Sequence, residues 1–274
     1  MKNVCVITGG GSGMGLATAK IMGKDNYILL VGRTQEKLKS ALQQLHSEGI
    51  EAESFVCDVS DWMSVKMLSV YAATLGKISS VIHAAGMSPN MGDYKKIMTA
   101  NALGTININN AFFDVMEAGS CIVDVSSMSG YLVPKIIIPA RSYKYSRTDT
   151  SLFMRRMIAR INLFPKKLRP LVSYSISKNF VSWFAQTDAA RFGAKGVRVV
   201  SVSPGTFETP MGELEKENAH EYLKYCAIKR PGKVEEIAHL LAFCANDKAG
   251  YLTGVDVLCD GGCVAGRKMP TKTR

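Results

Sequence analysis

The 274-residue chain is long enough for one α/β domain with a large core, and it is short for two domains. Its hydrophobic content of 47% is typical of a globular protein, and we expect no membrane span because no run of about 18 apolar residues is present. The formal net charge of +11 is concentrated in residues 131–173, where ten Lys or Arg and one acid, Asp149, give +9. The rest of the chain is nearly neutral, which argues against a general nucleic-acid-binding surface.

Short apolar segments alternate along the chain with longer segments of helical periodicity. We expect strands at 4–7, 27–31, 52–57, 80–83, 121–126, 197–202 and 255–259. We expect helices at about 13–22, 35–47, 64–75, 100–116, 175–192 and 235–245. This alternation predicts a parallel sheet covered by helices on both faces. Right-handed crossovers make it an α/β, doubly wound, Rossmann-type sheet that binds its ligand beyond the C-terminal strand ends.

The seven cysteines are scattered, and none has the short paired spacing of a zinc site. Four of them, Cys5, Cys57, Cys121 and Cys259, lie in apolar segments that we interpret as buried strands. We expect small core residues in a reducing compartment and no metal site. Since the first strand begins at once, leaving no room for a signal peptide, we expect a cytoplasmic protein.

A glycine cluster, TGGGSGMG at 8–15, separates the first strand from the first helix. Glycines permit a tight turn and a close approach of a pyrophosphate to the backbone, and the helix N-terminus offers free N–H groups. A plain strand–helix turn is the alternative. Because the cluster follows the first strand of an alternating chain, we expect Gly9, Gly11, Ser12 and Met14 to bind a dinucleotide.

The end of the second strand usually decides between NAD and NADP. An acidic residue there would bind the ribose hydroxyls and repel a 2′-phosphate. This chain has Gly32, Arg33 and Thr34 instead, and a guanidinium favours the 2′-phosphate. We therefore predict NADP(H) as the preferred cofactor, with NAD(H) as the alternative if Arg33 is only a solvated surface charge.

A YxxxK motif places Tyr174 and Lys178 on one face of a helix. Free tyrosine has a pKa of about 10, and a neighbouring ammonium together with an oxidised nicotinamide would lower it towards working pH. A surface pair is the alternative for this motif alone. The interpretation becomes specific with Ser127, which follows the fifth strand; Ser126 is its rival.

The TGxxxGxG spacing at 8–15 resembles the short-chain dehydrogenase/reductase family, and the resemblance extends over almost the whole chain. CDV at 57–59 is similar to the adenine-binding segment, HAAG at 83–86 stands at the family's NNAG, SPG at 203–205 with Thr209 matches PGxxxT, and DGG at 260–262 is the closing motif. The loss of both NNAG asparagines puts the usual strand-stabilising contacts in doubt. The resemblance implies cofactor contacts from Gly9, Gly11, Ser12, Met14, Arg33, Asp58, Val59, Ala85, Gly86, Tyr174, Lys178, Pro204, Gly205, Phe207 and Thr209.

The same resemblance implies the catalytic roles. Ser127 polarises the substrate oxygen and Tyr174 exchanges its proton. Lys178 tunes Tyr174 and holds the nicotinamide ribose, and Asn101 helps to position a water for proton relay. The cofactor itself carries the hydride chemistry.

The segment between Ser127 and Tyr174 is unusually long. The separation is 174 − 127 = 47 residues, against about a dozen in the family, so roughly 34 residues are inserted. We predict a single domain, 1–274, with a helical insertion at about 131–173. Within it Leu152, Phe153, Met154, Met157, Ile158, Ile161 and Phe164 recur at helical spacing, opposite Arg155, Arg156 and Arg160. Thr148 or Asp149 could cap this helix, which could pack on the body or on a subunit, cover the substrate as a lid, or lie on a membrane surface.

An insertion at this place is similar to the bacterial 3α-hydroxysteroid dehydrogenase/carbonyl reductases, where it shapes the steroid site and blocks one helix-bundle interface. The resemblance implies an oxidoreductase that interconverts a secondary alcohol and a ketone on a hydrophobic substrate, a hydroxysteroid or bile acid. It also implies a homodimer, with a tetramer as the alternative. Arg33 departs from an NAD-preferring pattern in that branch. Two rival functions are a 3-oxoacyl thioester reductase, whose acidic carrier protein would dock on the arginines, and a non-catalytic NADP-sensing protein.

Overall fold

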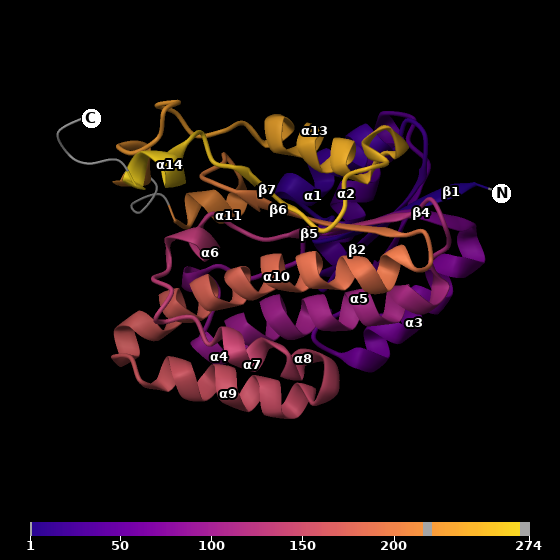
Figure 1. Ribbon diagram of the computed structural model, residues 1–274. Coiled ribbons are helices and arrows are strands. Elements are labelled where there is room, and N and C mark those ends of the chain that lie inside the picture. Colours follow the sequence, from indigo (N-terminus) through magenta and orange to yellow (C-terminus); the bar gives the residue numbers. More distant parts are fainter. Residues whose placement is uncertain (1, 216–220, 269–274) are drawn as a thin grey trace.

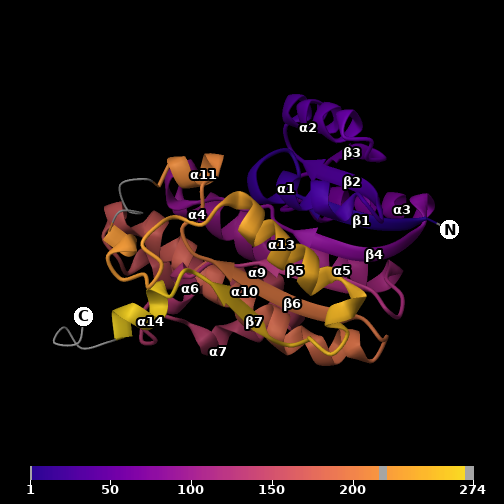
Figure 2. The same cartoon turned by 90° about the horizontal axis from the view of Figure 1, so that it is seen from above.

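The computed structural model describes residues 2–215 and 221–268, which form one seven-stranded parallel sheet between two layers of helices (Figure 1). The strand order is β3-β2-β1-β4-β5-β6-β7, with β3 and β7 at opposite edges (Figure 2). The strands are β1 Asn3–Thr8, β2 Tyr27–Gly32, β3 Ala52–Val56, β4 Lys77–His83, β5 Cys121–Val125, β6 Arg198–Pro204 and β7 Asp256–Cys259. Every pair is parallel, which confirms the predicted doubly wound sheet.

Helices cover both faces of the sheet. One layer consists of α1 Gly13–Met22, α2 Gln35–Ser47 and α13 Val234–Ala245; the other consists of α3 Trp62–Leu75, α5 Gly104–Val115 and α10 Arg169–Gly193 (Figure 1). Side chains of β1 point alternately to the two faces of the sheet. Cys5 and Ile7 pack against the first helical layer, and Val4 and Val6 pack against the second. This burial on both sides explains why the strands are continuous apolar segments.

The chain reverses its direction across the sheet between β3 and β4. After β1 the strands progress to one edge through β2 and β3, and the chain then returns to place β4 on the other side of β1. The carboxyl ends of β1 and β4 therefore diverge into a crevice, which is where open α/β sheets bind ligands. The glycine turn after β1 and the HAAG segment after β4 both lie at this edge.

Residues 131–173 contain a further helical layer, which consists of α7 Ala140–Tyr143, α8 Tyr145–Thr148 and α9 Thr150–Asn162 and lies below α5 and α10 (Figure 1). The helix α6 Ser129–Leu132 precedes this layer, and the 3-10 turn η3 Lys166–Leu168 follows it. The Asp149 side chain caps α9 by accepting a hydrogen bond from the Leu152 N–H, as one of the two predicted caps. Phe153, Met157 and Ile161 are fully buried where α9 packs on residues 94–103 and on α10. Of the predicted arrangements, the structure therefore supports a helix that packs on the body.

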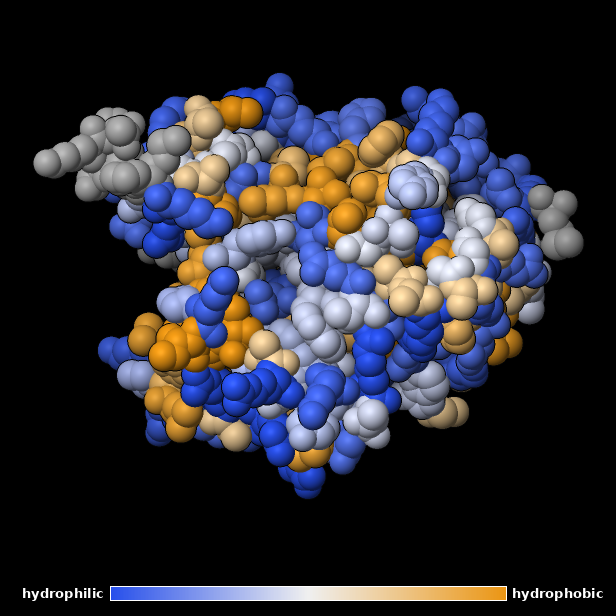
Figure 3. Space-filling model, in the orientation of Figure 1, coloured by the Kyte–Doolittle hydropathy of each residue, from blue (hydrophilic) through white to orange (hydrophobic). Residues whose placement is uncertain are grey.

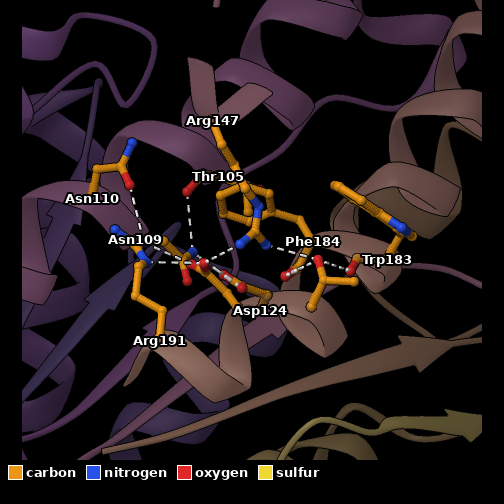
Figure 4. A network of polar contacts seen from close by, with 10 residues as sticks. Thr105, Asn109, Asn110, Asp124, Arg147, Trp183, Phe184 and Arg191 are labelled. Atoms are coloured by element: carbon orange, nitrogen blue, oxygen red, sulfur yellow. Dashed lines mark hydrogen bonds and ion pairs between the residues drawn. The ribbon is translucent and has the colours of Figure 1, made fainter. Parts of the chain in front are cut away.

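A polar contact holds this layer to α10 (Figure 4). Arg147 of α8 approaches Asp188 to 3.3 Å and donates to the Thr187 hydroxyl at 2.7 Å. Asp188 also pairs with Arg191 at 2.7 Å and is almost fully buried. The Arg147 guanidinium lies over the rings of Trp183 and Phe184.

Some predicted elements need correction. The helix expected at 100–116 is divided into α4 Tyr94–Met98, a π-helical turn at Thr99–Leu103 and α5. The helix expected from 175 begins at Arg169, since Pro170 is well suited to a first helical turn. Cys259 is half-buried and not fully buried, because β7 is an edge strand. The remaining elements are η1 Pro89–Met91, α11 Pro210–Glu213, η4 Asp247–Ala249 and α14 Cys263–Lys268.

Candidate active site

A cleft at the carboxyl ends of β1, β2 and β4 is lined by ten of the fifteen predicted cofactor residues. They are Gly9, Gly11, Ser12, Met14, Arg33, Asp58, Val59, Ala85, Gly86 and Thr209. Of the other five, Tyr174, Pro204, Gly205 and Phe207 line the adjoining pocket described below, and Lys178 lines neither cavity. Thr34, Lys37 and Leu38 also line the cleft and were not among the predicted contacts. Lys37 lies in the first turn of α2, directly after the Arg33 segment, and a second cation at that place is the signal that could have found it.

The glycine turn has the shape that a dinucleotide requires. A Cβ on Gly9 would lie 2.9 Å from the backbone of Ala84 and Ala85, and one on Gly15 would lie 2.5 Å from the Gly9 carbonyl oxygen. Gly9 also has a φ of 69°, in the left-handed region. Ser12 begins α1 without a side-chain cap, so the first N–H groups of the helix face the cleft. The residues present therefore fit an NAD(P) dinucleotide.

A histidine replaces the contacts expected from the lost asparagines after β4. His83 Nδ1 lies 2.8 Å from the Thr8 hydroxyl, which also accepts a hydrogen bond from the Ala85 N–H at 3.1 Å. The ends of β1 and β4 are thus joined through side chains as well as by the sheet. Burial lowers the pKa of His83 to about 3, and the nearby Lys178 charge acts in the same direction.

Ser127 and Tyr174 meet at the floor of a second cavity. Ser127 follows β5, Tyr174 lies near the start of α10, both line this cavity, and the Ser127 hydroxyl is close enough to the phenol to influence its pKa. Burial raises the pKa of the Tyr174 phenol, the Ser127 hydroxyl lowers it, and the charge of Glu215 raises it further. Ser126 points elsewhere, because its hydroxyl donates to the Lys178 carbonyl at 2.6 Å and accepts from Ser182 at 2.9 Å. The structure thus joins Ser127, and not Ser126, to the phenol.

Lys178 is buried below the phenol. Its Nζ donates to the Val125 carbonyl at 2.8 Å and is 6.0 Å from the centroid of the Tyr174 ring. Burial lowers the pKa of Lys178 to about 8, against the opposing effect of Asp124. Burial is also the main influence on the Tyr174 phenol, whose pKa it raises. The lowering of the Tyr174 pKa by Lys178 together with an oxidised nicotinamide stays a prediction.

Asp124 is a buried carboxyl group that the sequence analysis missed. Both of its oxygens accept hydrogen bonds from the Asn109 amide at 3.1 Å, and the side chain is fully buried in β5 (Figure 4). Burial raises its pKa to about 8. An acidic residue in the middle of an apolar strand segment was the signal that could have identified it.

Asn101 lies on the π-helical turn beneath Gly86. Its side chain accepts from the Met87 N–H at 2.8 Å and donates to the Met87 carbonyl at 3.0 Å and to Ser177 at 3.1 Å. A Cβ on Gly86 would be 3.0 Å from Asn101 Oδ1 and 3.4 Å from Lys178 Nζ. Asn101 and Lys178 therefore lie side by side below the dinucleotide cleft, and Gly86 leaves room for both.

The second cavity is a mainly apolar pocket beside the phenol. Its lining residues are Met14, Ser88, Pro89, Ser126, Ser127, Met128, Ser129, Leu171, Tyr174, Pro204, Gly205, Thr206, Phe207, Thr209, Met211, Gly212, Glu215 and Tyr222. Met14, Thr209 and Met211 also line the dinucleotide cleft, so the two cavities are continuous. Of residues 131–173 only Leu171 lines the pocket, and the interpretation of α9 as a lid is therefore wrong.

Among residues 2–215 and 221–268, no group of three or more His, Cys, Asp or Glu side chains could hold a metal ion. None of the helices in this described part is long and apolar enough to span a membrane.

Comparison with known proteins places this arrangement in one family. Residues 3–157 match the family model of short chain dehydrogenases, and residues 165–264 match the model described as enoyl-(acyl carrier protein) reductase. A short-chain dehydrogenase/reductase of Alternaria brassicicola is 28% identical over 269 residues, with 96% of each chain covered. The 3-oxoacyl-[acyl-carrier-protein] reductase of Thermotoga maritima is 26% identical over 273 residues, covering 95% of this chain and 97% of the relative.

Solved structures show the same fold. A short-chain type dehydrogenase/reductase from Mycobacterium ulcerans superposes with a TM-score of 0.77 at 21% identity, covering 96% of this chain and 90% of the other. A short chain dehydrogenase from Burkholderia cenocepacia in complex with NADP has a TM-score of 0.76 at 21% identity, with 95% and 97% covered.

The sheet, the glycine turn and the adjoining cavities define a dinucleotide-dependent oxidoreductase of the α/β class. Within that class the chain belongs to the short-chain dehydrogenase/reductase family.

Proposed function

We propose that the protein interconverts a secondary alcohol and a ketone with NADP(H), using Tyr174 as the acid and base. The observation that carries this proposal is that Ser127 and Tyr174 line the same apolar pocket, which is continuous with the dinucleotide cleft. One cavity has the lining for a dinucleotide and the other is apolar. A substrate oxygen in the pocket can therefore contact both hydroxyls.

Each of the four side chains has a separate role in the proposed reaction. The Ser127 hydroxyl donates to the substrate oxygen, which polarises the carbonyl group. The Tyr174 phenol gives its proton to that oxygen during reduction and takes it back during oxidation. The bound cofactor supplies or accepts the hydride. Asn101 and Lys178, buried together below Gly86, position the groups above them.

The preference for NADP(H) is supported by two cations at the adenosine end of the cleft. Arg33 and Lys37 both line it, and residues 32–34 contain no acid. Burial raises the pKa of the nearby Asp58 carboxylate, but the hydrogen bonds that it accepts from Ser60 N–H and Oγ, at 2.9 and 2.7 Å, and the charge of Arg33 lower it below its usual range. A 2′-phosphate would meet two positive side chains there.

The pocket supports a hydrophobic substrate with a bulky skeleton, which is consistent with the hydroxysteroid branch of the family. Its walls carry Met128, Leu171, Phe207 and Met211. The Glu215 carboxylate also lies in the wall and raises the pKa of Tyr174. A neutral hydroxysteroid is therefore a better fit near the phenol than the anionic end of a bile acid, whose carboxylate would have to point outwards.

A 3-oxoacyl thioester reductase is the second candidate, favoured by the match of residues 165–264 and by the relative in Thermotoga maritima. Exposed Arg155 and Arg156 could receive an acidic carrier protein. Turnover of steroids and of acyl thioesters, compared in the same absorbance assay, separates the two functions. Activity confined to carrier-bound thioesters, and lost at high salt, would favour the reductase.

Replacing Tyr174 by Phe tests the mechanism. We expect Tyr174→Phe to lower kcat at least about 100-fold in both directions, because a positioned general acid and base contributes about 10²–10⁴-fold. Cofactor binding, followed by NADPH fluorescence, should remain. The fully exposed Tyr251 offers a matched Tyr251→Phe control with normal turnover. Full activity of Tyr174→Phe would refute the mechanism. If the wild-type protein did not bind NADPH at all, a role as a cofactor sensor would be excluded as well.

We also propose a homodimer in the cytoplasm, with residues 131–173 as an insertion in a single domain. The proposal of a dimer rests on α9, which packs on residues 94–103 and on Phe180 and Phe184 of α10 and so removes this face from subunit contact. The cytoplasmic location is supported by the seven free cysteines, six of them buried.

A further inference from the structure

Exposed aliphatic side chains gather where α9 ends and α10 begins. Ile136, Leu163 and Leu168 are 84%, 72% and 48% exposed. Lys135, Lys166 and Lys167 stand beside them in the chain and are exposed as well. We call these six residues the rim patch. Figure 3 shows apolar residues with hydrophilic neighbours in this region, below the notch at the left of the molecule.

The rim patch is held in a defined shape. The Arg160 guanidinium of α9 donates to the Ile137 carbonyl at 3.0 Å and also to the Ile136 carbonyl, which ties the loop after α6 to the last turn of α9. Arg169 donates to the carbonyls of Phe164 and Asn162, each at 3.0 Å, and thereby fixes the connection into α10. The aliphatic side chains therefore protrude from a braced surface and do not belong to a loose loop.

The rim patch adjoins the mouth of the substrate pocket. Leu171 follows Leu168 by one turn, is 46% exposed and lines the pocket wall. A lipophilic molecule that leaves an apolar phase at the rim patch would meet Leu171 next and then the pocket.

Cations greatly outnumber acids in the segment that contains the rim patch. Residues 131–173 carry ten cations and one acid, and the acid is Asp149 at the far end of α9. A helix of 13 residues is roughly 20 Å long, so Asp149 lies well beyond the Debye length of about 8 Å at physiological salt. The rim patch itself therefore contributes only positive charge, from Lys135, Lys166 and Lys167.

We propose that the rim patch docks on an anionic lipid bilayer, so that the pocket opens onto the membrane surface. Protruding aliphatic side chains suit a deformable apolar phase, whereas a folded partner would need a groove shaped to receive them. Lysines beside such side chains are attracted to anionic headgroups. Lysine is depleted in protein–protein interfaces, which argues against an acidic carrier protein at this place.

Co-sedimentation with vesicles tests the proposal without any turnover, so its failure is separate from failure of the proposed enzyme activity. The full chain is mixed with vesicles of phosphatidylcholine alone or with about 30% phosphatidylserine, an anionic content that mimics a cytoplasmic leaflet. We expect binding only to the anionic vesicles, weakening as salt is raised. Ile136→Ser/Leu163→Ser and Lys166→Glu/Lys167→Glu should each weaken binding about tenfold or more.

Matched controls separate the rim patch from the general charge of the protein. Met67→Ser/Val70→Ser removes two aliphatic side chains of comparable exposure, 57% and 53%, from α3. Lys24→Glu/Lys248→Glu changes the net charge by the same amount at exposed positions outside residues 131–173. Both controls should bind within about twofold of the wild type, and every variant should reduce a water-soluble ketone normally.

Three results would overturn the proposal. The first is equal binding to neutral and anionic vesicles, or none to either. The second is an equal loss in the rim variants and their controls, which would indicate net charge alone. The third is a rim variant that changes the oligomer mass or carrier-protein affinity while vesicle binding stays normal.

Discussion

Three buried titratable side chains lie beneath the two cavities, and each is shifted away from its charged form. His83, Asp124 and Lys178 have pKa values of about 3, about 8 and about 8, with burial as the main cause in each. The charge of Lys178 also disfavours a proton on His83. The Lys178 ammonium, which donates to the Val125 carbonyl, also lowers the pKa of Asp124 against the larger effect of burial.

His83 should make the protein sensitive to acid. Its folded-state pKa is lowered from about 6.5 to about 3, so the unfolded chain binds the proton more tightly, and stability present above pH 6.5 is lost as the pH falls towards 3. Between pH 6.5 and 4.5 the loss from this group is about 2–3 kcal/mol. Urea unfolding of His83→Asn should lack that part of the pH dependence. The exposed His239 provides His239→Asn as the control, and equal slopes for both variants would contradict the assignment.

Arg33 and Lys37 should decide the cofactor preference. Hydrogen bonds to charged groups contribute about 1.5–3 kcal/mol, so Arg33→Ala and Lys37→Ala should each lower kcat/KM for NADPH about 10- to 100-fold and change that for NADH little. Steady-state kinetics with both cofactors measures the ratio. Lys39→Ala is the control, because Lys39 is exposed on the same helix and does not line the cleft. An unchanged ratio would leave Arg33 and Lys37 as surface charges.

At the scale of elements, the helical layer within residues 131–173 is held to α10 by packing and by polar contacts. Phe153, Met157 and Ile161 share a buried apolar cluster with Phe180 and Phe184 of α10. The Tyr143 hydroxyl donates to Asn179 Oδ1 at 3.0 Å, and Arg147 contacts Asp188 and Thr187. The layer is therefore attached to the middle and the last turns of α10.

Removing Arg147 should therefore destabilise the protein more than removing a surface cation. Asp188 is buried and would keep only Arg191, so we expect Arg147→Met to cost about 1–3 kcal/mol, less than a full buried pair because Arg147 is one-third exposed. Lys66→Met, which breaks the exposed pair with Asp114, should cost less than about 0.5 kcal/mol. Urea unfolding of both variants measures the difference, and equal losses would mean that the layer is held by packing alone.

At the scale of the whole molecule, the active site exists because distant segments meet at one edge of the sheet. The reversal between β3 and β4 brings Gly9 against Ala84, and the order β4-β5-β6 brings Ser127 beside the residues after β6. Met14, from the first helix, and Met211, from α11, line both cavities. Cofactor binding should therefore be linked to the stability of the entire fold.

NADPH should raise the melting temperature of the protein. A ligand at 100 times its Kd stabilises the folded state by about 2.7 kcal/mol, which corresponds to roughly 5–10 °C for a chain of this size. Calorimetry should show a smaller shift with NADH at the same concentration. Gly9→Ala should abolish the shift, because its Cβ would lie 2.9 Å from the Ala84 backbone. Gly119→Ala, also at positive φ but in open space, should keep it; loss of the shift in both variants would point to general unfolding.

Local patterns were sufficient for the sheet and its principal helices. Two helices, 13–22 and 35–47, have the predicted bounds, and Asp149 caps α9 as one of two predicted residues. The family and its oxidoreductase class were likewise predicted from short motifs. Periodicity, glycine turns and motif spacing are properties of neighbouring residues, so they can be recognised before the chain is folded.

Contacts between segments distant along the chain decided the details of the active site and the place of α9. Two contacts join segments that are distant along the chain: the Lys178 ammonium donates to the Val125 carbonyl, and His83 pairs with Thr8. The π-helical turn that carries Asn101 likewise depends on its tertiary surroundings. The same holds for α9, because its sequence allowed its apolar face to cover a substrate, and only the structure shows that this face packs on α4 and α10. Burial and pairing depend on what folding brings opposite each side chain, and only the folded structure contains that information.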